Sequence, residues 1–289
     1  MKLALKIDVD TLRGTEAGVQ RLVELLKKHG AGATFLFSLG PDRTGRALRR
    51  AFRPGFFSKV SRTSVIEHYG IRTLLYGTLL PGPDIGLRCR EIMTATRDAG
   101  FEVGIHCWDH VRWQDFVAGK GAEWTQREMR LAIERFAAIF GHEPRTWGAA
   151  GWQTNVHAAR FEERFDYASD TRGTHPFQPV WNGQAVGCPQ VPTTLPTLDE
   201  LIGLHDDVVR HLLGLTGERD HVFTAHAELE GGKLAPFFDR LLAGWKQQGY
   251  ELVSTSQIPR GALPRHEVVY GEVPGRSGIL ALQGTEVRP

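Results

Sequence analysis

Cysteine is scarce in this sequence: the 289 residues include only Cys89, Cys107 and Cys188, and no two of these form a C-x-x-C pair. An odd number of widely spaced cysteines excludes a disulfide framework and a cysteine-rich zinc site. We therefore expect a reducing, cytoplasmic setting.

Long apolar runs are also missing. No stretch approaches the roughly 18 apolar residues that a membrane-spanning helix requires. The short apolar stretch at the N-terminus is interrupted by Asp8 and Asp10 before it could form the core of a signal peptide. The sequence therefore predicts a protein that is neither exported nor membrane-spanning.

No charge of one sign dominates the chain. Its 35 Lys and Arg nearly balance 33 Asp and Glu, which leaves a net charge of +2. This balance excludes nucleic-acid binding by the surface as a whole, so we expect no nucleic-acid partner. Basic residues are nevertheless concentrated in residues 43–66, which contain seven of them and no acidic residue.

Apolar residues recur with the periods of strands and helices in alternation. The predicted strands span 3–9, 33–38 and 101–106, with further short strands near 146–150, 165–170, 186–191, 221–226 and 250–253. The predicted helices include 19–29, which ends at Gly30, and 88–99. Repeated strand-then-helix units indicate a parallel sheet, closed or open, and 41% apolar content is enough to fill one large domain.

One further helix has sequence signals at both ends. Thr125 and Glu128 match a capping box, which predicts that the helix begins there, and Gly141 is placed to end it. Between them, apolar residues recur at helical spacing and are expected to face the core: Met129, Ile133, Phe136 and Phe140.

Polar side chains follow several of the predicted strands. Asp8 and Asp10 end the first strand on one face, His106 ends the strand 101–106 with His110 just beyond, and His226 ends a late strand. Parallel α/β folds gather their catalytic groups at these strand ends. Two histidines and a carboxylate suffice for a catalytic zinc-type site. An isolated H-x-x-x-H is more often structural, but the whole set favours metal-assisted hydrolysis.

Three motifs carry a family resemblance: IDVD (7–10), HCWDH (106–110) and FTAHAE (223–228). They resemble the successive motifs of the polysaccharide deacetylase, or NodB-like, family of metal-dependent amidases. The resemblance implies an α/β fold, an irregular (β/α) barrel of that type. This domain would span residues 1–256, and we leave open whether the tail 257–289 is ordered.

The resemblance also implies roles for the five polar residues. In the family pattern, Asp8 is the catalytic base, His226 is the general acid, and one divalent metal ion is bound by Asp10, His106 and His110. Zinc is the expected ion, although manganese, cobalt and nickel suit the same ligands.

The sequence departs from the family where an arginine usually orients the base. The corresponding segment is WGAAGWQ (147–153), which contains no arginine. Arg172 is a candidate to take over that role, and Asp170 is a candidate to orient the acid. The resemblance implies that the oxyanion receives a hydrogen bond from a main-chain N–H near Gly151 or Trp152.

A longer resemblance, in the same order along nearly the whole chain, points to one branch of the family. Members of that branch remove formate from 4-deoxy-4-formamido-L-arabinose linked to undecaprenyl phosphate, in the pathway that modifies lipid A and gives polymyxin resistance. The expected partner is thus a polyisoprenyl-phosphate-linked formamido sugar. The matching segments lie at 6–15, 37–42, 104–110, 149–153, 169–173, 191–200 and 226–231.

Three tryptophans lie beside the motifs. Trp108, Trp113 and Trp152 could each offer a flat apolar face to a sugar ring. Tryptophan is equally common as a packed core residue, so both interpretations stay open.

Residues 41–87 interrupt the alternation and form a basic, amphipathic insertion. At helical spacing, four arginines share one face and Phe52 the other, before Pro54 and Gly55 break the helix. This pattern is typical of a segment in a membrane interface, and we expect docking on the anionic cytoplasmic leaflet of the inner membrane. The alternative is a solvated basic face that packs on the barrel. The residues expected at the membrane are Arg46, Arg49, Arg50, Phe52, Arg53, Phe56 and Phe57.

Two rival functions share the same motifs. A general polysaccharide N-deacetylase would use the same metal site, but the lack of an export signal argues against it, since such polymers usually lie outside the cell. An inactive sugar-lipid binding protein would not need the acid His226 and the base Asp8, which are both retained.

Overall fold

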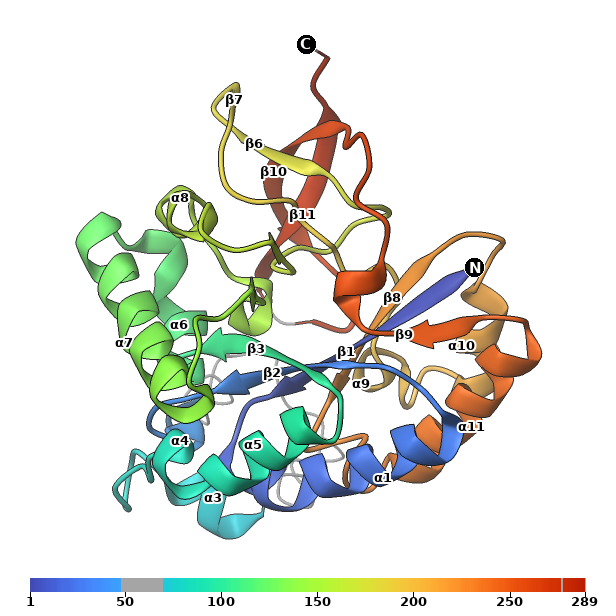
Figure 1. Ribbon diagram of the computed structural model, residues 1–289, viewed down its shortest axis with the longest axis horizontal. Coiled ribbons are helices and arrows are strands. Elements are labelled where there is room, and N and C mark those ends of the chain that lie inside the picture. Colours follow the sequence, from blue (N-terminus) through green and yellow to red (C-terminus); the bar gives the residue numbers. More distant parts are fainter. Residues whose placement is uncertain (48–69, 277, 289) are drawn as a thin grey trace.

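The computed structural model describes residues 1–47, 70–276 and 278–288, and it centres on a curled parallel sheet wrapped by helices (Figure 1). The strands run in the order β5-β4-β3-β2-β1-β8, with β9 also paired to β1. Their bounds are β1 Lys2–Val9, β2 Thr34–Ser38, β3 Glu102–Cys107, β4 Thr146–Trp147, β5 Tyr167–Ala168, β8 His221–His226 and β9 Glu251–Val253. The predicted irregular (β/α) barrel is confirmed as a curled half-barrel.

Strand β1 lies at the centre of this sheet. It pairs with β2 through residues 6–9, with β8 through residues 3–8, and with β9 through residues 2–4. Because β1 has neighbours on both sides, it is buried along nearly its whole length. Polar residues on this strand are therefore held rigidly inside the protein.

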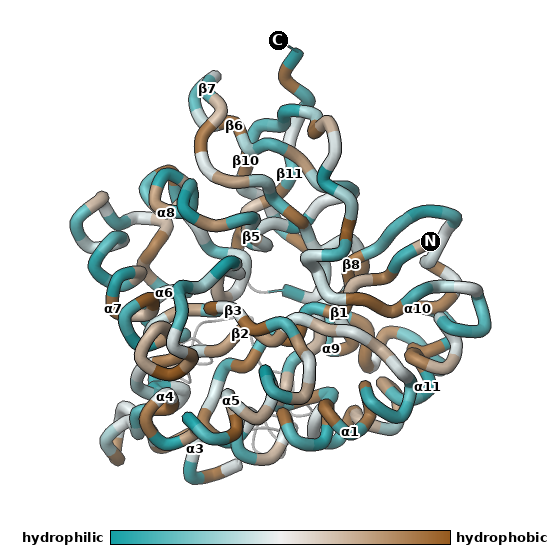
Figure 2. Tube along the Cα trace, viewed as in Figure 1, coloured by the Kyte–Doolittle hydropathy of each residue, from teal (hydrophilic) through white to brown (hydrophobic). Residues whose placement is uncertain are grey.

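Helices cover the outer face of the sheet, with α1, α5 and α11 packed side by side (Figure 1). Figure 2 shows hydrophobic residues along β1 and β2, whereas hydrophobic and hydrophilic residues alternate along α1 and α11. Within the described residues, no helix is long and apolar enough to cross a membrane. The helix bounds are α1 Val19–His29, α3 Ile71–Leu75, α4 Ile85–Arg88, α5 Arg90–Asp98, α6 His110–Phe116, α7 Ala122–Phe140, α8 Val156–Glu162, α9 Leu198–Leu201, α10 Val208–Leu215 and α11 Ala235–Gln247.

The predicted start of helix α7 is wrong. The helix begins at Ala122, after an extended Gly121, and no side chain caps it. Thr125 and Glu128 are instead buried inside the helix, because Ala-Glu-Trp continues it by one turn toward the N-terminus. The C-terminus is as predicted, since Gly141 has the left-handed conformation (φ 77°) in which glycine ends helices.

A second, smaller sheet has the strand order β11-β10-β6-β7. Figure 1 shows it at the top of the molecule. The backbone of Arg172 joins this sheet by bonds to Ala281 and Gln283. The last described residues of the chain therefore pack against the barrel. The strand bounds are β6 Gln178–Trp181, β7 Gln184–Ala185, β10 Arg265–Glu272 and β11 Ile279–Glu286.

Candidate active site

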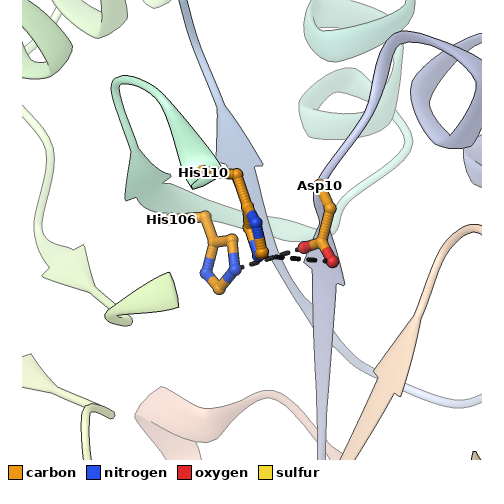
Figure 3. Close-up of side chains that lie close together, drawn as sticks. All are labelled: Asp10, His106 and His110. Atoms are coloured by element: carbon orange, nitrogen blue, oxygen red, sulfur yellow. Dashed lines mark ion pairs between the residues drawn. The ribbon is translucent and has the colours of Figure 1, made fainter. Parts of the chain in front are cut away.

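Three potential metal ligands meet at one edge of the sheet (Figure 3). Asp10 follows β1, His106 lies near the end of β3, and His110 begins α6. The Nε2 atom of His106 lies 3.2 Å from Oδ1 of Asp10, and Nε2 of His110 lies 3.4 Å from Oδ2. One ligand atom from each residue lies within 4.8 Å of the other two. Donors this close together fit around a single ion with bonds of about 2 Å.

A hydrogen bond to the main chain fixes how His106 can bind. Its Nδ1 lies 2.6 Å from the carbonyl oxygen of Gly148, which can only accept a hydrogen bond. The proton therefore resides on Nδ1, and Nε2 keeps its lone pair facing Asp10. This is the tautomer that a metal ligand requires, so the donor set fits a divalent ion.

The third ligand, His110, is held by the start of its helix. Asp109 caps α6 by accepting a bond from the backbone N–H of Arg112 at 3.1 Å. The same carboxylate accepts a bond from Nη1 of Arg43 at 2.6 Å. The cap fixes the first turn of α6 and so the position of its first residue, His110.

Opposite charges dominate the electrostatics of the three ligands. Burial alone would raise the pKa of Asp10, but the charge of His110 and a hydrogen bond to His106 hold that pKa well below its usual value. Burial would lower the pKa of His106, yet Asp8 and Asp10 raise it. The two carboxylates thus create a site that favours a positive charge.

Asp8 lies beside a lysine that we did not single out from the sequence. Nζ of Lys6 is 3.4 Å from Oδ2 of Asp8, and the two side chains are 0% and 4% exposed. Lys6 also donates a hydrogen bond to the carbonyl oxygen of Ser169 at 3.0 Å. Oδ1 of Asp8 is buried and accepts no hydrogen bond from a described residue. Lys6 could have been found, because it shares with Asp8 the polar face of an otherwise apolar strand.

The prediction that Arg172 orients Asp8 is wrong. Its guanidinium instead makes a two-bond ion pair with Glu200, at 2.6 and 3.3 Å, and donates to the carbonyl oxygen of Leu195. Lys6 occupies the position beside Asp8 because the two residues are neighbours on one face of β1.

His226 lies directly across from Asp8, since the two residues are register partners on the adjacent strands β8 and β1. Its backbone N–H donates to Oε2 of Glu230 at 2.7 Å. Asp199 lies near enough to feel its charge: burial raises the pKa of Asp199, but Arg276 and His226 lower it. The pKa of Asp199 is thus held below its usual value, in part by the charge of His226.

The structure does not bring Asp170 to His226 as predicted. Its Oδ1 accepts the backbone N–H of Ala149 at 2.7 Å, and its Oδ2 accepts Nε2 of Gln190 at 3.2 Å. Asp170 therefore fixes the loop after β4. Its direction could not be predicted because it depends on the contacts of that loop.

Trp152 is part of the wall of the site and does not offer a face to a sugar. It is 2% exposed, its Nε1 donates to Oγ1 of Thr193, and the cations of Lys6, Arg172 and Arg276 lie 5.3, 5.0 and 4.8 Å from its ring centre. The predicted stacking on a sugar ring is therefore wrong, because cations and protein atoms already cover the ring.

The backbone around Trp152 is also unusual. Gly151 and Trp152 both have positive φ angles, 63° and 52°. A tryptophan in this region is strained, and such strain is commonest at functional sites. The backbone N–H of Trp152 donates to the carbonyl oxygen of Ala149 at 3.1 Å, so this N–H is already engaged.

The other two predicted sugar-binding tryptophans differ from each other. Trp113 is buried, its Nε1 donates to the carbonyl oxygen of Gln153, and its ring packs 5.3 Å from that of Trp147. It is a core residue, so the sugar-binding prediction is wrong for it. Trp108 is partly exposed beneath the guanidinium of Arg135.

Of the residues predicted to reach a membrane, the structure describes one. Nε of Arg46 donates to the carbonyl oxygen of Gly77 at 2.8 Å. The remaining predictions lie outside the described residues: Arg49, Arg50, Phe52, Arg53, Phe56 and Phe57.

Comparisons with known proteins show the family of this chain. The sequence profile of the family described as polysaccharide deacetylase matches residues 3–168. A protein of Shewanella sediminis, named as a probable 4-deoxy-4-formamido-L-arabinose-phosphoundecaprenol deformylase, is 35% identical over 99% of this chain and 96% of its own. A protein of the same name from Wigglesworthia glossinidia brevipalpis is 32% identical over 93% of this chain and 98% of its own.

A solved structure shares the fold. It is a protein from Mycobacterium smegmatis described as a polysaccharide deacetylase, and it superposes with a TM-score of 0.60. The match covers 89% of this chain and 88% of that one, at 16% identity. The profile match over more than half of the sequence, together with the two full-length relatives, shows that this chain belongs to the polysaccharide deacetylase family.

Proposed function

We propose that this protein is a metal-dependent amidase that removes formate from 4-deoxy-4-formamido-L-arabinose carried on undecaprenyl phosphate. Two nearly full-length relatives bear the name of that deformylase. The observation that carries the chemistry is the pairing of Asp8 with His226 across β1 and β8, beside the three ligands. A base and an acid next to a metal site are what amide hydrolysis needs.

The ion would be held by Asp10, His106 and His110, the group of described residues that offers a donor set for it. When bound, a divalent ion polarises a carbonyl group and lowers the pKa of water. Zinc is the favoured ion, and manganese, cobalt or nickel would also suit two histidines and a carboxylate.

Asp8 accepts the proton of the attacking water. Its buried Oδ1, which has no hydrogen-bond donor among the described residues, is the acceptor for that proton. Lys6 holds the other oxygen, Oδ2, and the low dielectric of this buried position strengthens the ion pair. Lys6 is thus a positioning residue that holds the base in its orientation.

The remaining steps, stabilisation of the oxyanion and protonation of the leaving nitrogen, depend on Gly151 and His226. Addition of water to the formyl carbon creates an oxyanion, and the backbone N–H of Gly151 donates to it, since that of Trp152 is engaged with Ala149. His226 gives its proton to the departing nitrogen, and the C–N bond breaks. The products are formate and the amino sugar, which stays linked to undecaprenyl phosphate and would then be used in the lipid A modification that gives polymyxin resistance.

Because the substrate carries a lipid, the protein must reach it at a membrane. The proposal therefore includes peripheral docking on the anionic cytoplasmic leaflet. Residues 43–66 supply seven basic residues. The described part of the insertion adds large exposed apolar side chains: Ile71, Leu79 and Leu87 are 67%, 80% and 69% exposed. Basic and apolar groups together favour reversible binding to anionic lipid.

Docking is tested by sedimentation with liposomes that contain anionic lipid. Replacing Arg46, Arg49, Arg50 and Arg53 with glutamine should release most of the protein into the supernatant, whereas Arg90→Gln, on α5, should not. Equal sedimentation of the fourfold variant and the wild type would argue for the solvated basic face instead.

The function itself is tested by formate release from a formamido-arabinose polyisoprenyl phosphate, with and without a chelator. An acetylated chitooligosaccharide is assayed in parallel. Chelator-sensitive release from the formamido sugar alone is expected. Turnover of only the acetylated glycan would favour the general N-deacetylase, and turnover of neither would favour the binding protein.

A further inference from the structure

A pocket lined by three arginines lies next to the candidate active site. Arg13, Arg72 and Arg88 border a cavity of about 330 Å³, together with Glu16 and Tyr76. We infer that this arginine pocket binds the phosphate group that links the sugar to its isoprenoid lipid. The inference rests on the proposed function and adds to it a second binding site on the same substrate.

The charge of the arginine pocket suits a phosphate. Its lining has three guanidinium groups and one carboxylate, that of Glu16. Among the described residues, none of the three arginines forms an ion pair. Other arginines near the site are already engaged: Arg43 pairs with Asp109 and Arg172 with Glu200. The described lining therefore carries three cationic groups and one anionic group, and guanidinium groups can make bidentate bonds to phosphate oxygens.

The distance from the metal ligands also suits the substrate. Arg13 follows the ligand Asp10 by three residues, and three residues span at most about 11 Å even when fully extended. In the proposed substrate, the formamide and the phosphate lie at opposite ends of a single sugar ring. Arg13 therefore lies within reach of the phosphate of a sugar whose amide is at the metal ligands.

The segment that carries Arg13 is packed tightly against the active-site loop. It continues into a π-helix, Gly14–Gly18, a rare form that is frequently found at functional sites. A Cβ at Gly14 would lie 1.9 Å from Oε1 of Glu228, and one at Gly18 would lie 2.0 Å from the carbonyl oxygen of Ala227. These contacts lock the pocket's first arginine to the loop that follows His226.

Another glycine, Gly70, lines the pocket and leaves room for the side chain of Arg13. Gly70 has φ 76°, and a Cβ there would lie 2.1 Å from Nη1 of Arg13. Any side chain at this position would displace the guanidinium. The Arg13 side chain therefore packs directly against the backbone of Gly70.

Apolar side chains beside the pocket distinguish a lipid phosphate from free phosphate. Ile71 lines the pocket and Leu87 precedes Arg88, and both are more than two-thirds exposed. An isoprenoid chain leaving the phosphate could cover these two side chains, whereas inorganic phosphate would leave them in water.

Equilibrium binding of farnesyl phosphate, with farnesol and inorganic phosphate as comparison ligands, tests this inference. The full-length protein is used with a chelator present, so that no turnover is needed. Replacement of Arg13, Arg72 or Arg88 by glutamine should weaken farnesyl phosphate binding about tenfold each, the loss expected for one charge-assisted hydrogen bond. Arg90→Gln, which removes a nearby exposed arginine outside the pocket, should leave it unchanged.

The outcomes separate the inference from the proposed function. Unchanged affinity in the triple variant, or inorganic phosphate binding as tightly as farnesyl phosphate, would overturn the arginine pocket. If farnesyl phosphate binds through the arginines but no formamido sugar is hydrolysed, the function fails and the pocket stands. Thermal unfolding of each variant checks the fold, and the single variants serve if the triple variant does not fold.

Discussion

Lys6 and Asp8 form an ion pair inside the protein, with Nζ 3.4 Å from Oδ2 and both side chains almost inaccessible to water. They project from the same face of β1, two residues apart, toward the three metal ligands. A lysine is rarely buried so completely without a partner of opposite charge. The pair therefore couples the stability of the central strand to the geometry of the base.

Replacing Lys6 with methionine should lower kcat by at least tenfold while KM for the formamido substrate stays nearly constant. The substitution leaves Asp8 in place but removes the group that fixes its orientation. Steady-state kinetics give this split, and bound metal per chain, measured on the same samples, should equal that of the wild type. A rise in KM alone would contradict the positioning role.

The same substitution should destabilise the fold by about 3 kcal/mol, since it leaves a buried carboxylate without its partner. Adding Asp8→Asn should recover much of that loss, because the unpaired charge is then removed. Chemical denaturation of the two single variants and the double variant measures the coupling. Strict additivity of the two effects would show that the ion pair contributes nothing.

Asp8→Asn should bind metal normally yet lose turnover by about 10²- to 10⁴-fold, the usual range for a general base. Asp10→Asn, two residues away on the same strand end, is the matched comparison and should lose the metal as well. Metal analysis and formate release on the two variants separate the roles. Near-normal turnover by Asp8→Asn would refute its assignment as the base.

His226→Gln should reduce kcat by a similar factor and should also change its pH dependence. A general acid must be protonated to act, so kcat of the wild type is expected to fall at alkaline pH. That alkaline fall should disappear in the variant, in which glutamine has no proton to lose. A variant that retained the same alkaline limb would exclude His226 as the proton donor.

The stability of the metal-free protein should fall between about pH 4.5 and pH 8, in part because of Glu230. Burial raises the pKa of this carboxyl to about 8 from an ordinary value of 4.5. The folded state therefore keeps a proton that the unfolded state releases. Its stabilising contribution is complete below pH 4.5 and is lost as pH rises through 8, with a slope of at most about 1.4 kcal/mol per pH unit.

Glu230→Gln removes this contribution to the pH dependence. The variant should show a shallower decline of melting temperature from pH 5 to pH 8 than the wild type, when both are measured with a chelator. Substitution of the exposed Glu218 by glutamine is the control and should leave the slope unchanged. Parallel curves for the wild type and Glu230→Gln would show that Glu230 is ionised throughout this range.

Much of the candidate site could be predicted because its residues lie at the ends of strands with clear periodicity. Asp8, Asp10, His106 and His226 each end a strand whose alternation is visible in the sequence, and parallel strands bring such ends together. The helix that ends at Gly141 was equally clear at its C-terminus, where only glycine adopts the left-handed turn without strain.

The parts that could not be predicted depend on contacts between distant segments. Whether Arg172 turns to Asp8 or to Glu200 is decided by how the loop after β5 packs, which leaves no periodic signal. The burial of Trp152 follows from cations supplied by three separate segments. The start of α7 was misjudged because Thr125 and Glu128 match a capping pattern but lie within a helix that already began at Ala122.

Residues of the small C-terminal sheet and its connecting loop contact Trp152 and Gln153 in the wall of the site, whereas the catalytic residues come from the barrel strands. Arg276 covers Trp152, and Nε2 of Gln153 donates to the carbonyl oxygen of Ile279. A chain shortened to residue 256 would thus retain the base, the acid and every metal ligand but lose these supports. The residues that perform the chemistry and the residues that support the wall beside them can therefore be altered independently.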